Sequence, residues 1–540
     1  MTALDIRLVS TADRGTAALA VAVRPALAAS GADPAGSTPA ADRPPAGQTD
    51  RPPAGRVDRP AADRAGLPTA VLAGLPAGDL TEAELAGLIA DNHIDGSAGR
   101  VDTLPRPGRQ PRTVYLVGVG AGRPADLRRA GAALARAAGR QRRVLTGLAA
   151  GADPAGLRAI VEGLGLATYR YSLASTPRPD GLRRVDLLGT CPAGTGSDPA
   201  AADALAAADA LARGLATVRA VHLARDLANT PPAEKSPAWL GAEAERALRP
   251  HGVRVLVRDE TWLGVHGFGG LLAVGGGSVR PPRLIEARYR PRAATGPHVV
   301  LVGKGITFDT GGLSIKPADA MPSMKTDMAG GAVVLAAVLA AAELRLPIKI
   351  TALVPTAENH VSGSAYRPAD VIRHYGGRTS EVLNTDAEGR IVLADALAYA
   401  VARLAPDVLV DVATLTGAMK VSLGTRTAGL FASDETLAAE LLAAAAAAGE
   451  PAWRMPLSDE YEPLLHSEVA DAVNAPGRGP GAITAALFLR PFTGGLPWAH
   501  LDVAGPARAG SDDGETSRGG TGYGVRTLLR WLEARVASGQ

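Results

Sequence analysis

Short apolar runs alternate with helix-like segments through the second half of the chain, and this alternation limits the fold more than any other feature. Each run is nearly continuous in Val, Ile and Leu, as in strands that are covered on both faces. Helices of a dozen or more residues between such runs are typical crossovers between parallel strands. The sequence therefore predicts an α/β domain with a mixed, mostly parallel sheet covered by helices. The runs are 252–257, 298–303, 348–354 and 407–412, and the helical segments are 235–247, 329–344, 391–404 and 435–448.

The first part of the chain predicts a separate and smaller α/β domain. A glycine-rich turn near residues 118–122 joins a strand to a helix, but its spacing does not fit a dinucleotide-binding loop, and such a turn alone is a weak signal. The expected elements lie over 4–24, 113–119, 124–138, 143–147, 153–163, 167–172 and 183–189.

An Ala-rich helix over about 200–227 ends before Pro231 and Pro232, and two prolines stop a helix firmly. We therefore place the junction between the two domains there. The expected divisions are an N-terminal domain over 1–199, a connecting helix over 200–228 and a second domain over 229–540.

Residues 30–66 repeat short R-P-P-A-G pieces and contain almost no large apolar side chains. A segment of this composition cannot bury enough apolar surface to fold. We expect a disordered low-complexity insert in the first domain. A binding arm is the alternative interpretation.

Composition narrows the class of protein. The single cysteine, Cys191, excludes an internal disulfide framework and indicates a reducing compartment, and we expect its thiol to be inert. The net charge of +3 is not concentrated in a dense Lys/Arg run, so nucleic-acid binding is not indicated. No secretory signal is evident, and the apolar stretches 329–342 and 436–448 are too short to cross a bilayer. We expect a soluble cytoplasmic protein that does not bind membranes.

Four carboxylates lie near the ends of predicted strands or the starts of predicted helices. Asp309 and Asp327 belong to the segment that follows the strand 298–303, and Asp386 and Glu388 immediately precede a helix. In α/β sheets the carboxyl ends of strands form the usual ligand site. Four carboxylates in one crevice repel each other unless cations neutralise them. Two divalent metal ions that share bridging carboxylates would do so.

Other site chemistries are less well supported. Gly303-Lys304-Gly305 lacks the upstream glycine of a phosphate-binding loop. The sequence contains neither H-E-x-x-H nor G-x-S-x-G, the motifs of zinc proteases and α/β-hydrolases. Helix caps, turn residues and surface ion pairs would explain any one of the four acids alone, but not the whole set at these spacings.

Four segments resemble the leucyl aminopeptidase (cytosol aminopeptidase) family of two-metal metallopeptidases. They are VGKGITFDTGGLSIKP from residue 302, Met324–Val333, NTDAEGRIVLADAL from residue 384 and DVATLTGA from residue 411. The resemblance is strong from about residue 215 to about 530. It implies a macro-like α/β N-terminal domain joined by a helix to a larger α/β metallopeptidase domain, and a homohexamer built as a dimer of trimers.

The resemblance also assigns roles to individual residues. Asp309 and Glu388 would bridge two divalent ions (Zn²⁺ or Mn²⁺), and Asp386 would serve one of the two sites. Lys304 and Asp327 would complete the other site, with Lys304 in its neutral form.

The family's reaction would proceed by attack of a metal-bridging hydroxide on the first peptide bond. Lys316 would stabilise the oxyanion, and Arg390 would hold a bicarbonate ion that acts as general base. Peptides with an apolar first residue, such as leucine, would be preferred within a broad range. The residues implied in substrate binding are Met324, Thr414, Leu415, Gly417 and Ala504.

The alternative function is a non-catalytic regulatory or DNA-binding protein on the same scaffold. Loss of a ligand residue would favour it, but all seven ligand and catalytic positions carry the residue that the family pattern requires. The sequence therefore predicts an active metalloexopeptidase.

Overall fold

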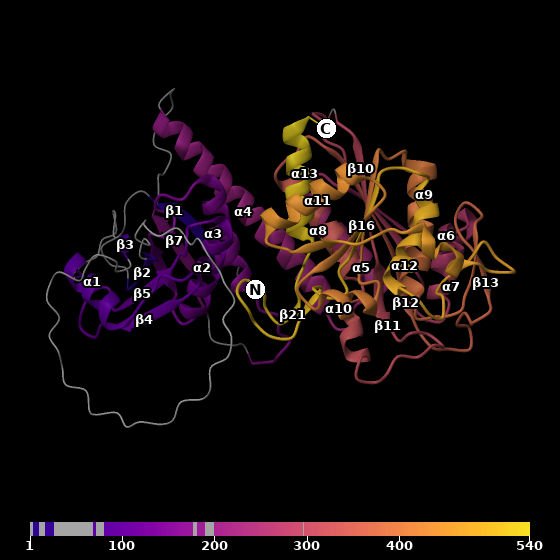
Figure 1. Cartoon of the computed structure of the whole chain (residues 1–540), viewed down its shortest axis with the longest axis horizontal. Coiled ribbons are helices and arrows are strands. Elements are labelled where there is room, and N and C mark those ends of the chain that lie inside the picture. Colours follow the sequence, from indigo (N-terminus) through magenta and orange to yellow (C-terminus); the bar gives the residue numbers. More distant parts are fainter. Residues whose placement is uncertain are drawn as a thin grey trace, which may run out of the picture. The chain divides into compact units, whose positions relative to one another are not determined.

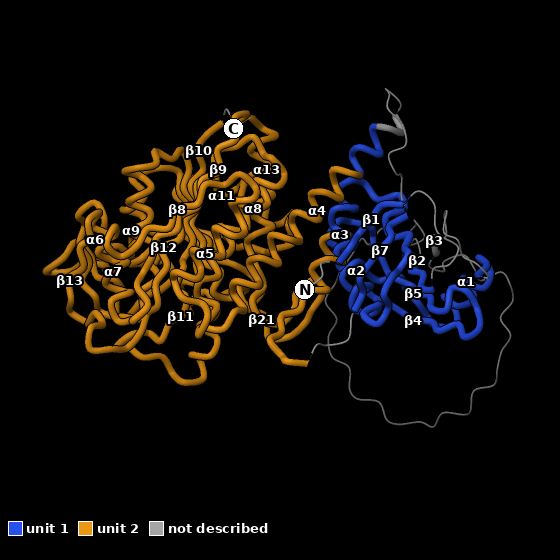
Figure 2. Tube along the Cα trace, turned by 180° about the vertical axis from the view of Figure 1, so that it is seen from behind, with its two compact units in different colours: residues 1–160, 180–207 blue, residues 161–179, 208–540 orange. Residues whose placement is uncertain are grey.

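The structure is a computed structural model. The chain divides into two compact units, one formed by residues 1–160 and 180–207 and the other by residues 161–179 and 208–540 (Figure 2). Cys191 and the segment 30–66 lie outside the described residues. The residues that the structure describes are 4–9, 17–25, 69–71, 80–176, 181–188, 199–294 and 296–539.

The first unit contains a mixed sheet in the order β1-β7-β6-β2-β5-β4, with β3 paired to β2. Its inner strands are parallel, and β4 and β3 pair antiparallel to their neighbours. The strands are β1 (Asp5–Val9), β2 (Ala18–Arg24), β3 (Thr69–Val71), β4 (Val101–Pro105), β5 (Thr113–Gly118), β6 (Arg143–Thr146) and β7 (Arg184–Leu188). The helices of this part of the chain are α1 (Glu82–Asp91), α2 (Pro124–Ala137) and α3 (Pro154–Ala167).

The separate element expected over 167–172 is absent. Helix α3 continues to Ala167, and residues 168–172 form neither helix nor strand. The buried side chains of Leu157, Ile160, Leu164 and Leu166 follow one another within the helix. The apolar run before residue 168 therefore belongs to a longer helix than the sequence predicted.

The larger unit is built on a mixed sheet in the order β17-β16-β19-β15-β10-β12-β9-β8, with β11 paired to β12. The four central strands β19, β15, β10 and β12 are parallel, and antiparallel pairs occur on both flanks. This confirms the predicted mixed, mostly parallel sheet. The strands are β8 (Arg254–Arg258), β9 (Arg283–Tyr289), β10 (His298–Gly303), β11 (Gly305–Asp309), β12 (Lys349–Asn359), β15 (Val408–Ala413), β16 (Ala428–Ala432), β17 (Ala452–Arg454) and β19 (Trp498–Asp502).

Helices cover both faces of this sheet. Figure 1 shows α8, α11 and α13 on one side of the strands and α9 and α12 on the other. Along β10, Val299 and Leu301 belong to one apolar core, whereas Val300 and Val302 belong to the other. The continuous apolar run is therefore explained by burial on both faces. The helices are α4 (Pro199–Asn229), α5 (Pro237–Leu248), α6 (Glu260–His266), α7 (Gly269–Gly275), α8 (Ala329–Glu343), α9 (Glu388–Leu404), α10 (Gly417–Leu423), α11 (Glu435–Ala448), α12 (Gly481–Leu489) and α13 (Val525–Ser538).

Short elements complete the unit. They are the 3₁₀ turns η2 (Arg249–His251), η3 (Met321–Thr326), η4 (Asp459–Leu465) and η5 (Arg490–Thr493), and the strands β13 (Val371–Arg373), β14 (Thr379–Glu381), β18 (Ala472–Val473), β20 (Arg508–Ala509) and β21 (Gly519–Gly520).

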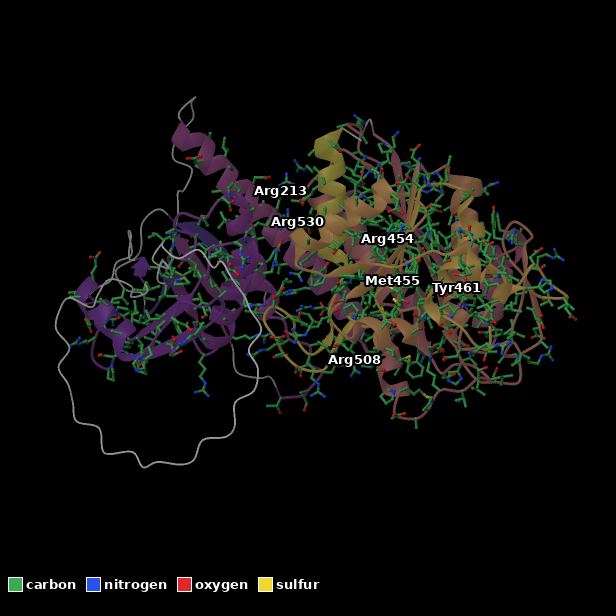
Figure 3. The ribbon with its side chains drawn as sticks, in the orientation of Figure 1. Arg213, Arg454, Met455, Tyr461, Arg508 and Arg530 are labelled. Atoms are coloured by element: carbon green, nitrogen blue, oxygen red, sulfur yellow. The ribbon has the colours of Figure 1, made fainter. Side chains whose placement is uncertain are left out.

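Ion pairs link α13 to two other helical segments of the same unit. Arg213 on α4 donates from Nη1 to Glu533 Oε1 at 2.9 Å. Arg530 on α13 donates from Nη2 to Glu162 Oε1 at 3.0 Å, and Glu162 is completely buried. Both arginines are labelled in Figure 3. These partly buried pairs fix α13 against α4 and the end of α3.

Helix α8 packs on the same face of the sheet as α11 and α13, and every residue from Ala329 to Ala342 is buried. Together with η3 it forms a stretch of 23 residues, Met321–Glu343, that is apolar and long enough to cross a membrane. The shorter apolar stretch 329–342 was predicted to be too short for this. The stretch is 94% buried within the protein over its most apolar window, as expected for a core helix.

Glycines let α8 approach the sheet closely. A Cβ on Gly330 would lie 2.0 Å from the carbonyl oxygen of Val412 on β15, and one on Gly303 would lie 2.5 Å from Gly330 O. Gly331 N donates to Lys304 O at 2.7 Å. The start of α8 is thereby fixed beside the carboxyl end of β10, and Asp327 lies just before it.

Candidate active site

Lys304 follows β10 directly, and its ammonium group lies between two carboxylates. Its Nζ is 2.9 Å from Asp327 Oδ2 and 2.7 Å from Glu388 Oε1, and it donates to Thr414 O at 3.0 Å. The side chain is almost completely buried. Gly389 makes room for it, because a Cβ there would lie 2.7 Å from Lys304 Nζ. Lysine and carboxylates from three separate segments are thus brought into contact.

Lys316 makes the corresponding contacts with the other two acids. Its Nζ is 2.8 Å from Asp309 Oδ2 and also pairs with Asp386 Oδ1. The chain reaches this position through a tight turn at Gly311 and Gly312, whose φ angles of +88° and +64° favour glycine. Lys316 N then donates to Thr310 O at 2.9 Å, which closes the loop.

Two buried polar residues orient this loop, and neither was predicted from the sequence to belong to the site. Asn359, at the end of β12, donates from Nδ2 to Asp309 Oδ1 at 2.8 Å and to Thr385 O at 3.0 Å. Thr385 Oγ1 donates to Gly311 O at 2.7 Å and accepts from Ser314 N at 2.7 Å. The segment that carries Asp386 is therefore tied to the segment that carries Asp309. The available sequence signal was the position of Asn359 shortly after the predicted strand 348–354.

Burial and neighbouring negative charge raise the pKa values of three acids of the cluster, Asp327, Asp386 and Glu388. Burial, followed by the negative charge of Asp309, raises the pKa of Glu388 to about 8 and that of Asp386 to about 6. Burial also raises the pKa of Asp327. Burial lowers the pKa of Lys304 and Lys316, but the surrounding carboxylates outweigh it and raise both pKa values. Four acids around two lysines thus form a site that favours additional positive charge.

The acids also fit a divalent metal. Asp309, Asp386 and Glu388 each offer an oxygen, and these oxygens lie within 4.8 Å of one another. Glu388 Oε2 is buried and has no hydrogen-bond partner among the described residues. A buried carboxylate oxygen without a donor is costly unless a cation binds it. The donor set therefore suits one or more divalent cations with oxygen ligands.

Arg390 lies two residues after Glu388 on α9 and is buried. Its Nη1 donates to Asn474 O at 2.9 Å, whereas its Nε has no hydrogen-bond partner among the described residues. Burial lowers the pKa of its guanidinium to about 10, against the opposing effects of Glu388 and Asp502. A buried guanidinium with free donor capacity is suited to bind a small oxyanion.

The predicted substrate residues lie on three segments around the acids. Thr414 follows β15, and its Oγ1 donates to Asp327 Oδ1 at 2.8 Å. Leu415 and Ala504 both donate from their backbone nitrogens to Asp502 Oδ1, at 3.2 and 3.1 Å. Gly417 begins α10, and Met324 lies in η3 just before Asp327.

Comparison with known proteins decides the family. Residues 222–529 match the catalytic domain of the cytosol aminopeptidase family, and residues 72–175 match its N-terminal domain. The chain belongs to the cytosol aminopeptidase family. It is 48% identical over 376 residues to a probable cytosol aminopeptidase of Roseiflexus castenholzii, covering 69% of this chain and 75% of that protein. It is 42% identical over 474 residues to the one of Streptomyces coelicolor, covering 84% of this chain and 91% of the relative.

A solved structure of the bottromycin maturation enzyme BotP in complex with Mn is similar to this cytosol aminopeptidase. The TM-score is 0.75 at 39% identity, and the match covers 83% of this chain and 96% of BotP. The predicted family, fold class and enzyme class are confirmed: the protein is a metal-dependent aminopeptidase, a hydrolase that acts on peptides and uses divalent metal. The alternative of a non-catalytic regulatory or DNA-binding protein is not supported.

Proposed function

We propose that this cytosol aminopeptidase removes single residues from the free N-terminus of peptides at a centre of two divalent ions, Zn²⁺ or Mn²⁺. The observation that carries the proposal is the placement of four acids around Lys304 and Lys316. The proposed metal ligands are Lys304, Asp309, Asp327, Asp386 and Glu388.

When bound, the two ions would polarise the first peptide carbonyl and lower the pKa of a bound water. This chain's residues supply the remaining requirements. Lys304 would give up its proton on metal binding, because a lysine ligand must be neutral. Lys316, freed from its ion pairs with Asp309 and Asp386, would direct its ammonium group toward the oxyanion of the tetrahedral intermediate.

Arg390 would hold bicarbonate as the general base. Its free Nε and its burial support this role, because a guanidinium can bind a planar oxyanion through two parallel hydrogen bonds. All four neighbouring carboxylates are proposed metal ligands, so none of them is left to act as the base.

Substrate binding would involve the segment from Thr414 to Gly417, with Met324 and Ala504 as further contacts. Thr414 and Leu415 would contact the peptide backbone, and apolar first residues such as leucine would be preferred within a broad range. The contacts of Thr414 with Asp327 and Lys304 support a position at the edge of the metal centre.

Family membership supports two further proposals. We propose a homohexamer built as a dimer of trimers and a cytoplasmic location. A third proposal, that the protein does not bind nucleic acid, is supported by the absence of a dense Lys/Arg run in the sequence. We also propose that the N-terminal domain spans 1–199, the connecting helix 200–228 and the catalytic domain 229–540, in keeping with the separate family matches at 72–175 and 222–529.

Hydrolysis of leucine p-nitroanilide tests the proposed function. We expect release of nitroaniline that needs Mn²⁺ or Zn²⁺ and stops when a chelator removes the metal. N-acetyl-leucine p-nitroanilide is the matched control, because it lacks the free amine. Equal cleavage of both compounds, or activity that survives complete metal removal, would contradict the proposal.

A further inference from the structure

Asp502 is a buried carboxylate that the proposed chemistry does not use. It is the last residue of β19 and is 1% exposed. Its Oδ1 accepts from the backbone nitrogens of Leu415 at 3.2 Å and Ala504 at 3.1 Å. Its Oδ2 accepts from Thr416 N at 3.1 Å and Thr416 Oγ1 at 2.7 Å. Four donors on one side chain offset the cost of burying the charge.

All four donors belong to the two segments that leave the sheet at this point. Strands β15 and β19 are parallel neighbours, and Ala413 is paired with Asp502. The segment after β15, Thr414–Gly417, therefore emerges beside the carboxylate. Ala504 follows on the other side, after β19. From the end of β19, Asp502 thus binds backbone groups of both segments.

The held segment contacts the proposed metal ligands through Thr414. Thr414 precedes the two residues that bind Asp502, and its Oγ1 donates to Asp327 Oδ1 at 2.8 Å. Its carbonyl oxygen accepts from Lys304 Nζ at 3.0 Å. A shift of the Leu415–Thr416 backbone would therefore move Thr414, which contacts Asp327 and Lys304.

We propose that Asp502 is a positioning residue for substrate binding: it fixes the Thr414–Gly417 segment and Ala504 so that they present a rigid edge to the peptide. The carboxylate itself touches no substrate. The inference rests on the proposed roles of Thr414, Leu415 and Ala504, and it deepens them by naming the group that sets their geometry.

Asp411 on β15 provides a matched control in the same sheet. It is fully buried and accepts from Trp498 Nε1 at 2.7 Å and His500 Nδ1 at 2.6 Å. These partners are side chains of the neighbouring strand β19, and none belongs to the Thr414–Gly417 segment. Asp411→Asn therefore perturbs the same core by a similar change without releasing the segment.

The experiment compares KM and kcat for leucine p-nitroanilide and a leucyl dipeptide in Asp502→Asn, Asp411→Asn and the wild type, at full metal loading. An asparagine has one acceptor oxygen, and its NH₂ group would face backbone N–H donors with which it cannot form hydrogen bonds. We expect Asp502→Asn to raise KM about tenfold or more, as the loss of charge-assisted hydrogen bonds implies. Its kcat and bound metal should change little, and Asp411→Asn should leave KM within about twofold of the wild type.

Thr416 gives a second, milder variant if Asp502→Asn does not fold. Thr416→Val removes the hydroxyl, which donates to Asp502 Oδ2 and also accepts from Met419 N at 3.3 Å as the N-cap of α10. It should raise KM by a few-fold, whereas Thr416→Ser, which keeps both hydrogen bonds, should restore it. An unchanged KM in the folded variants, or metal loss from Asp502→Asn, would overturn the positioning role alone. A wild-type enzyme without hydrolysis would overturn the proposed function and this inference together.

Discussion

Two lysines form ion pairs with the four acids of the centre, and they divide these acids into two pairs. Lys304 contacts Asp327 and Glu388, whereas Lys316 contacts Asp309 and Asp386. At the scale of single residues, metal binding would remove a proton from Lys304 and release the ammonium group of Lys316 from its ion pairs. Proton release and metal uptake are then linked.

The affinity for metal should depend on pH. Without metal, the pKa of Glu388 is raised to about 8, so this acid is largely protonated at pH 6 and ionised above pH 8. A cation binds the ionised form, and its apparent affinity should therefore rise from pH 6 to pH 8 by up to about tenfold per unit for each proton displaced. Competition with a metal-binding dye measures Mn²⁺ affinity, with the dye's own pH dependence as control. A constant affinity over this range would contradict the assignment.

Arg390→Ala should separate catalysis from metal binding. We expect the variant to keep its metal and its KM but to lose turnover by about 10²–10⁴-fold, as expected on loss of a general base. Wild-type activity should fall when bicarbonate is removed and recover when it is restored, while the variant responds little. Metal loss from the variant, or a bicarbonate response as steep as that of the wild type, would show that Arg390 has another role.

At the scale of elements, the close contact between α8 and the sheet positions Asp327. Gly330→Ala places a methyl group 2.0 Å from Val412 O, which is a backbone atom of a central strand and not the end of a flexible side chain. We expect a loss of about 3 kcal/mol in the free energy of unfolding, the upper range for overpacking, together with weaker metal binding. Thermal unfolding and metal analysis measure both effects.

Gly264→Ala in α6 is the matched control for Gly330→Ala. No heavy atom would lie within 4 Å of its Cβ, and alanine is favoured over glycine in a helix by about 1 kcal/mol. This variant should be as stable as the wild type or slightly more stable. Equal stability of the Gly330 and Gly264 variants would show that α8 tolerates a wider spacing.

Elements with a clear period could be predicted from the sequence, whereas those set by tertiary pairing could not. The core strands around 298–303 and 407–412 were predicted because both of their faces are apolar. Strand β12 continues five residues beyond the predicted end at 354, to Asn359. Pairing with β11 and β9 extends it through polar residues that resemble a loop. The contacts of Asn359 with Asp309 were missed for the same reason.

The acids of the candidate site could be named from local motifs, but the groups that orient them could not. NTDAEGR identifies Asp386 and Glu388 within seven residues. Asp502 acts on residues 86 and 87 positions earlier in the chain. Such contacts depend on the order of strands in the sheet, which cannot be predicted from a short sequence motif. The acids could therefore be predicted from the sequence, whereas the residues that orient them could not.

At the scale of the whole molecule, deletion of the segment 30–66 tests a prediction that rests on amino-acid composition alone. Its lack of large apolar residues predicts that it contributes nothing to the packed domains. Deleting it should leave peptidase activity, oligomeric size and melting temperature close to those of the full chain. Activity assays, sedimentation and thermal unfolding check this, and a large fall in melting temperature would mean that the segment docks on the fold.

The most direct test of the account is the metal content of Glu388→Gln, a change that keeps shape and removes charge. Because Glu388 is proposed to bridge both ions, we predict two divalent ions per chain in the wild type and close to none in the variant, with peptidase activity lost and the fold intact by circular dichroism. Elemental analysis after gel filtration gives the count. Two ions retained by Glu388→Gln, or fewer than two in a fully active wild type, would contradict the two-ion centre.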